Sequence, residues 1–270
     1  MNYFTNIVNE VLTWCHPELT VVETYDVLFV TGDIPAIVYL YKVTTKTSTL
    51  LTIPNILTQS DDIAHTDNKL WLYRVATPKT IFEWNITLAP FTAVYNREIT
   101  NIKSSAGMGA ANSSKLISFE YVDALNHKIY DTDITNLAAV NTFKYNGIAG
   151  RNITGDFILT TTNKLIALNN IIIPPYTTYI TQYDYLTGAV EFDIDISSIF
   201  PGSPNPTPYG LFEYDSEIYI AGPTGVYPSP NGVIYKIEKV APYSMTLYDS
   251  TSYRIYGASQ VPEQLTVHFT

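Results

Sequence analysis

Cysteine is almost absent from the sequence, which has Cys15 as the single one among 270 residues. One thiol cannot form a disulfide within the chain, so packing has to stabilise the fold. Cys15 follows Trp14 in a short apolar run. For such a position we expect a buried, inert thiol rather than a nucleophile.

Basic residues are scarce as well. Lysine and arginine total 15 against 25 aspartates and glutamates, which gives a formal net charge of −10. The basic residues are spread along the chain and form no cluster. Because nucleic acids and anionic membranes are recognised through clustered positive charge, the composition argues against both as partners.

The sequence also lacks long apolar segments and a leader. Its apolar runs are all far shorter than the roughly 18 residues that a membrane-spanning helix requires. The first residues contain no lysine or arginine, so no signal peptide is expected and the protein should be made in the cytoplasm.

The familiar catalytic signatures are missing too. No HExxH, CxxC, GxSxG or phosphate-binding glycine loop occurs. Gly107 and Gly109 superficially suggest a glycine loop, but a strand is expected after them. Without a helix N-terminus such a loop does not bind phosphate, and close packing at a channel is the better interpretation.

Strand-forming residues are abundant, with 22 tyrosines alongside many threonines and isoleucines. In the segment 61–99, short apolar runs alternate with polar turn-forming clusters. This pattern is typical of a four-stranded antiparallel meander. One meander cannot bury both of its faces, so it needs copies of itself beside it.

The unit recurs, with openings near residues 62, 109, 155, 210 and 257. The spacing of about 46–55 residues is typical of propeller blades. The sequence therefore predicts an all-β, six-bladed β-propeller of four-stranded antiparallel blades, forming a single domain over residues 1–270. Strands from both termini are expected to close the last blade, which removes exposed sheet edges. The predicted blades are 19–59, 60–102, 103–148, 149–201, 202–252, and 253–270 together with 1–18.

In a propeller the first strand of each blade lines the central channel. The acidic and histidine candidates on these strands are Asp62, His65, Asp156 and Glu213. Asp62 and Asp156 are the candidate ligands for Ca²⁺, which prefers oxygen donors. His65 is expected to make a structural hydrogen bond, because strand geometry assures neither Asp62 nor Asp67 as a carboxylate partner.

Two proline-rich loops are the candidate partner-binding segments, since loops on a rigid scaffold often carry recognition. The first also suits a semi-rigid connector between two blades. The candidate binding residues are Pro204, Pro206, Pro208, Pro223, Tyr227 and Pro228.

The run from Asp62 to Tyr73, with Glu83-Trp84-Asn85-Ile86-Thr87, resembles a repeat found in propeller proteins of tailed-phage virions. A Thr-, Asn- and Tyr-rich composition with little lysine is similar to that of phage structural proteins. The resemblance implies a non-enzymatic head, neck, tail or fibre component, assembled in the host cytoplasm. Its partners would be other virion or assembly proteins.

Two alternatives stay open. One is a metal-dependent, lactonase-like hydrolase that acts at the channel mouth. The other is a carbohydrate-binding propeller, which would need exposed tryptophans. Trp71 and Trp84 are expected in the core, because aromatic side chains dominate cores. Fold alone does not choose among these functions.

Overall fold

The computed structural model describes residues 20–24, 26–56, 59–66, 68–74, 79–88, 90–103, 107–123, 126–160, 162–171, 177–198, 208–215, 217–224, 231–238, 244–260 and 264–268. Within these ranges the regular structure consists of β-strands. No helix in the described ranges is long and apolar enough to cross a membrane. Trp14 and Cys15 lie outside them.

The strands form five four-stranded antiparallel sheets, which are the blades of a propeller. Blade one contains β21 (Gly257–Gln260), β2 (Asp26–Val30), β3 (Val38–Lys42) and β4 (Thr47–Leu51). Blade two contains β5 (Ser60–Thr66), β6 (Lys69–Arg74), β7 (Thr80–Leu88) and β8 (Phe91–Ile99). Blade three contains β9 (Met108–Asn112), β10 (Lys115–Asp123), β11 (Asn126–Asp133) and β12 (Val140–Asn146). Blade four contains β13 (Asn152–Leu159), β14 (Lys164–Ile171), β15 (Thr177–Asp184) and β16 (Val190–Asp195). Blade five contains β17 (Gly210–Tyr214), β18 (Glu217–Pro223), β19 (Gly232–Ile237) and β20 (Met245–Thr251).

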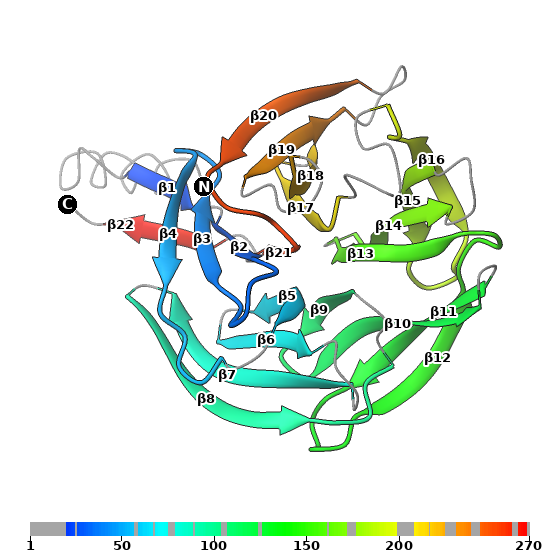
Figure 1. The fold of residues 1–270 in the computed structure, drawn as a ribbon, viewed down its shortest axis with the longest axis horizontal. Helices are drawn as coiled ribbons and strands as arrows, with labels where there is room; N and C mark the ends of the chain where they lie inside the picture. Colours follow the sequence, from blue (N-terminus) through cyan, green and yellow to red (C-terminus); the bar gives the residue numbers. More distant parts are fainter. Residues whose placement is uncertain are drawn as a thin grey trace, which may run out of the picture.

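The first strand of each sheet lies innermost, as Figure 1 shows. Each inner strand contacts the inner strand of the next blade, in the order β5, β9, β13, β17, β21 and back to β5. These contacts close the ring, so the sheets form a propeller and not an open array.

The predicted all-β propeller with antiparallel four-stranded blades is confirmed, but the described chain forms five blades where six were predicted. The first blade combines β21, near the C-terminus, with β2, β3 and β4, near the N-terminus. The prediction had split this one blade into a complete first unit and a shared sixth unit.

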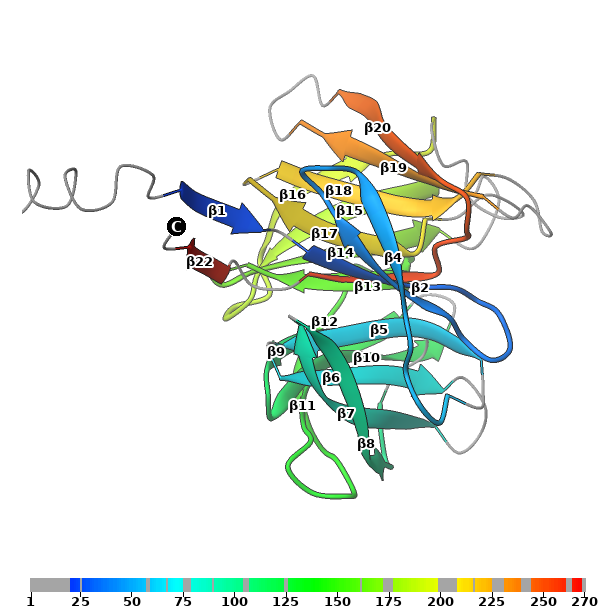
Figure 2. The same ribbon diagram turned by 90° about the vertical axis from the view of Figure 1, so that its left-hand side faces the viewer.

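The miscount arose at β1 (Thr20–Thr24), which was taken as the inner strand of the first blade. This strand instead pairs with β22 (Gln264–His268) in a separate two-stranded sheet. Figure 2 shows the β1–β22 pair projecting beyond the blades. Strands of suitable composition can pair outside a blade, and periodicity alone does not separate the two cases.

Each of the five hydrophobic clusters lies between two neighbouring blades. Trp84 packs between blades one and two, and Trp71 between blades two and three. Both side chains are buried, and their indole nitrogens donate to the Pro54 carbonyl and the Glu83 carboxylate, respectively. The two tryptophans are therefore core residues and offer no exposed platform for a sugar.

The turn between β15 and β16 illustrates how local chemistry sets the strand ends. The Asp184 carboxylate accepts hydrogen bonds from the Thr187 amide and hydroxyl, both at 2.9 Å. These bonds hold the pKa of Asp184 below its usual value. Gly188 has a φ of 75°, which a residue with a side chain rarely adopts. These contacts and the glycine conformation form the turn that joins β15 to β16.

Candidate functional site at the channel mouth

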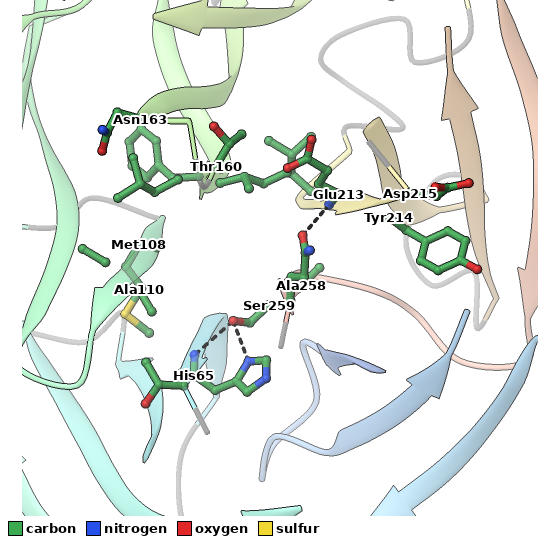
Figure 3. Close-up of a pocket in the computed structure, with 18 residues that line it drawn as sticks. His65, Met108, Ala110, Thr160, Asn163, Glu213, Tyr214, Asp215, Ala258 and Ser259 are labelled. Atoms are coloured by element: carbon green, nitrogen blue, oxygen red, sulfur yellow. Dashed lines mark hydrogen bonds between the residues drawn. The ribbon is translucent and has the colours of Figure 1, made fainter. Parts of the chain in front are cut away.

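A cavity of about 530 Å³ opens at one end of the central channel. It lies where the inner strands β5, β9, β13, β17 and β21 meet, so residues from different blades face one another across it. Figure 3 shows His65 and Ser259 on one side of this cavity and Thr160 and Asn163 on the opposite side. The volume is within the range of ordinary small-molecule sites.

The strand register shows which residues of the inner strands meet at the cavity. Five residues occupy the same register position on the five inner strands: His65, Ala110, Leu159, Glu213 and Gln260. The polar ones come from blades five, one and two, which are neighbours. Blades three and four supply an alanine and a leucine at this position, and Thr160 and Asn163 of blade four add polar groups across the cavity.

Ser259 and His65 make a close polar contact in this cavity. The Ser259 Oγ lies 2.8 Å from Nδ1 of His65, and the His65 backbone N–H donates to the same oxygen at 3.0 Å. Figure 3 shows both bonds. The ring nitrogen and the backbone nitrogen of His65 both bond to the hydroxyl oxygen, so the position of the hydroxyl at the cavity wall is fixed. A serine hydroxyl beside an imidazole nitrogen is the arrangement that activates a nucleophile.

Burial lowers the pKa of His65 to about 3. The imidazole is therefore neutral across the physiological range and can accept a proton. Its Nε2 atom is buried without a hydrogen-bond partner. No carboxylate among the described residues bonds to this histidine, unlike the histidine of a Ser-His-Asp triad.

Below the cavity, Asp62 and Asp156 meet inside the channel. Asp62 accepts hydrogen bonds from the backbone N–H groups of Ile63, at 2.8 Å, and of Met108. Asp156 Oδ2 accepts from Leu211 at 3.2 Å and Ala258 at 2.6 Å. The two carboxyls therefore tie all five inner strands together beneath the cavity floor.

Both carboxyl groups are fully buried, and each acts on the ionisation of the other. Burial, followed by repulsion from Asp62, raises the pKa of Asp156 well above its usual value. Two buried carboxylates in contact cannot both ionise cheaply, so the pair holds a shared proton.

Glycines leave the space that this pair needs. Asp62 and Asp156 share one register position, which is Gly107, Gly210 and Gly257 in the other three blades. A Cβ at Gly257 would lie 2.7 Å from Asp62 Oδ1, and one at Gly107 would lie 2.1 Å from the Gly155 carbonyl oxygen. Gly107 therefore serves close packing at the channel, as its sequence context predicts.

The donor set at the carboxyl pair does not favour a metal. Backbone N–H groups, which repel cations, point at both carboxyls. The described part of the chain contains no group of three or more His, Cys, Asp or Glu side chains placed to hold an ion. Calcium binding by Asp62 and Asp156 stays a prediction, for which the structure offers two of the six to eight oxygen ligands that calcium takes.

The sequence-based candidates on the inner strands come together. Asp62 and His65 lie on β5, Asp156 on β13 and Glu213 on β17. His65 and Glu213 line the cavity, whereas the two aspartates lie below it. The hydrogen-bond partner of the His65 ring is Ser259, and Asp67 lies outside the described residues.

Among the loop candidates, Pro204, Pro206, Tyr227 and Pro228 lie outside the described residues. Pro208 directly precedes the inner strand region of blade five, and Pro223 ends β18; both are buried. These two prolines therefore contribute to the packing of blade five.

Sequence reasoning missed Ser259, Gln260, Thr160 and Asn163. A hydroxyl or amide in a strand rich in such residues carries no signal of its own. Gln260 accepts a hydrogen bond from the Glu213 backbone N–H at 2.7 Å, and this contact joins residues far apart in the chain. The unit openings near residues 62 and 257 already put Ser259 on an inner strand, but its residue type gave no reason to select it.

No protein-family model matches the sequence, and no curated protein matches it either. Solved structures are similar in fold. Two are named "putative 6-phosphogluconolactonase". The one from Bacteroides uniformis has a TM-score of 0.51 and 9% identity over 88% of this chain and 99% of that chain. The one from Bacteroides fragilis has a TM-score of 0.49 and 8% identity over 88% and 98%. A periplasmic gluconolactonase from Pseudomonas aeruginosa has a TM-score of 0.41 and 7% identity over 84% and 68%.

At these identities the likeness establishes the propeller fold alone. The predicted function as a non-enzymatic phage virion module is contradicted, because the similar structure from Bacteroides uniformis is named as a putative 6-phosphogluconolactonase and nothing in this comparison links the chain to a virion. The resemblance had rested on strand and turn patterns in one blade. Such patterns reflect propeller architecture and are shared by propellers of unrelated function.

Proposed function

We propose that the protein is a hydrolase that cleaves a small lactone or ester bound at the channel mouth. The observation that carries this proposal is the Ser259–His65 contact of 2.8 Å in the wall of a small-molecule-sized cavity. The names of the similar structures suggest a cyclic sugar ester as the first substrate class to test.

In the proposed reaction, the Ser259 Oγ attacks the carbonyl carbon and passes its proton to Nδ1 of His65. The carbonyl carbon–alkoxy oxygen bond breaks, and the leaving oxygen takes the proton back from the imidazole. Water then hydrolyses the acyl-serine, with His65 again as proton acceptor and donor. The product is the hydroxy acid, and the serine is regenerated.

The weakness of His65 as a base has a measurable consequence. Because burial lowers its pKa to about 3, the imidazole stays unprotonated far into the acid range. Hydrolysis should therefore persist down to about pH 4, whereas a histidine with an ordinary pKa would lose activity near 6.5. The lack of a carboxylate partner favours activated substrates such as lactones over amides.

The test combines turnover and covalent trapping. Purified protein is assayed with a panel of sugar lactones and simple esters, and is treated separately with a fluorophosphonate probe. We expect Ser259→Ala to abolish labelling and to lower turnover at least 100-fold. Ser118→Ala is the matched control, because Ser118 is equally buried but lies in β10 and bonds to Thr132. Labelling elsewhere, or turnover that survives Ser259→Ala, would contradict the assignment.

Carbohydrate binding without catalysis is the second candidate, and the polar lining from three neighbouring blades favours it. Trp71 and Trp84 play no part in it, because both are buried. Saturable sugar binding by a protein that neither hydrolyses any of the esters nor reacts with the probe would favour this function instead.

A further inference from the structure

The charged side chains of the cavity lining are all of one sign, which is negative. The lining contains two carboxylates, Glu213 and Asp215, and no lysine or arginine among its described residues. His65 adds no positive charge, because burial keeps its imidazole neutral. A bound anion would therefore meet carboxylates and no cation.

The nearest lysines point away from the cavity and form ion pairs with carboxylates on the outer strands of their blades. The first residue of the second strand of each blade lies at the channel mouth. In blades two, three and four this residue is Lys69, Lys115 and Lys164, respectively. Lys69 lies 2.9 Å from Glu83, and Lys115 lies 3.7 Å from Asp131. Each of these carboxylates is on a third strand, so the ammonium groups are directed away from the cavity.

Lys164 follows the same rule, since it pairs with Asp184 at 3.3 Å and with Glu191. Blade five breaks the rule, because the corresponding residue is Glu217. This carboxylate is paired with Lys236 at 3.5 Å on the next strand. Blade five therefore has a carboxylate where blades two, three and four have a lysine, and it also supplies both carboxylates of the cavity lining.

Glu213 is the carboxylate best placed to meet a ligand. It occupies the register position of His65 and Gln260, and its side chain is half-buried. Figure 3 shows it on the side of the cavity where Thr160 lies, while Tyr214 and Asp215 lie farther out. A carboxylate at a partly enclosed site binds an ammonium group through charge-assisted hydrogen bonds.

We propose that the cavity selects small polyhydroxylated molecules that carry a protonated amine, with the amine placed against Glu213, and that it disfavours phosphorylated sugars. This inference rests on the proposed function, because it names the substrate class of the same site. It also separates this chain from the phosphorylated substrate that the name 6-phosphogluconolactonase implies for the similar structures.

Binding of three matched probes tests the inference without any catalytic step. D-Glucosamine, D-glucose and D-glucose 6-phosphate are titrated into the full chain by calorimetry at low salt. We expect glucosamine to bind about ten-fold more tightly than glucose, and glucose 6-phosphate more weakly than either. Added salt should shrink the differences, since they arise from charge.

Glu213→Gln should remove the preference for glucosamine while glucose binding persists, which also shows that the variant is folded. Glu217→Gln is the matched control and should leave all three affinities unchanged, because that carboxylate pairs with Lys236 outside the cavity. Equal affinities, a preference for glucose 6-phosphate, or no binding of any probe would overturn the inference. Lactone turnover alongside such a result would leave the proposed function standing. A Glu213-dependent preference without turnover would support the inference and defeat the hydrolase.

Discussion

Two buried carboxyl groups in this protein have opposite acidities, and their partners explain the difference. The side chains of Glu83 in blade two and Asp156 in the channel are both fully buried. Burial alone raises the pKa of each. Around Glu83, hydrogen bonds from Arg97, Lys69, Trp71 and Asn96 outweigh burial and bring the pKa down to about 2. Asp156 instead meets a second carboxyl, so its pKa rises further.

The two sites therefore affect stability in opposite directions as pH changes. The folded-state pKa of Glu83 lies below its ordinary value of 4.5, so its contribution is present above pH 4.5 and is lost as the pH falls towards 2. The folded-state pKa of Asp156 lies above its ordinary value of 3.8. Its contribution is present at low pH and is lost as the pH rises through the folded value. Burial disfavours the ionised form of both Glu83 and Asp156, and the neighbouring groups determine which protonation state is favoured at each site.

The largest expected effect comes from removing the anion from the cationic cluster. Glu83→Ala leaves Lys69, Arg97 and the Trp71 indole without their acceptor. Arg97 also donates to the Ile134 and Thr135 carbonyls of blade three. The substitution therefore also weakens the contact between blades two and three. We expect a loss of about 3–5 kcal/mol in the free energy of unfolding, measured by urea denaturation at pH 7.

Glu191→Gln is the control for this experiment, because Glu191 pairs with Lys164 at a more exposed site. Its loss should stay below about 1 kcal/mol. If Glu83→Ala costs no more than the control, the buried cluster contributes nothing beyond an ordinary surface pair, and the comparison with Asp156 fails.

A smaller effect is expected at the carboxyl pair. In Asp156→Asn the amide oxygen can still accept from Leu211 and Ala258, and the amide nitrogen can donate to Asp62 in place of the shared proton. Stability at pH 5 should change by about 1 kcal/mol or less. We expect the melting temperature of the native protein to decline as the pH rises through the raised pKa of Asp156, and the variant should lose part of this decline.

Asp156→Ala serves as the contrast, because it leaves two buried N–H groups without an acceptor. That variant should lose roughly 2 kcal/mol or more at every pH. An Asn variant as damaged as the Ala variant at pH 5 would mean that the native pair carries no shared proton.

The smallest expected effect is that of calcium. Calcium at Asp62 and Asp156 would need both carboxyls ionised, against burial and four backbone N–H donors. We therefore expect thermal melts with excess calcium and with chelator to agree within about 1 °C. Saturation at about 100 times the dissociation constant would add roughly 2.7 kcal/mol and shift the melt by several degrees, which would establish the metal site.

Strand periodicity and turn chemistry were enough to predict an all-β propeller with antiparallel four-stranded blades. They also placed Asp62, His65, Asp156 and Glu213 on inner strands, because each follows a unit opening. The blade count was wrong, since β1 has the composition of a blade strand and pairs with β22 instead. The predicted phage function failed for a related reason: repeat patterns describe how blades are built and not what they bind.

The sequence by itself thus determined the strand type, the repeat and the inner-strand positions, since these depend on alternation and turns within a few residues. Tertiary structure alone decided that Asp62 meets Asp156, that Ser259 bonds to His65, and that polar residues from three neighbouring blades line one cavity. These contacts join residues separated by 94 positions for the aspartates, as 156 − 62 gives, and by 194 for the Ser–His pair. Ring closure brings such residues together, and no local pattern encodes which blade will lie beside which.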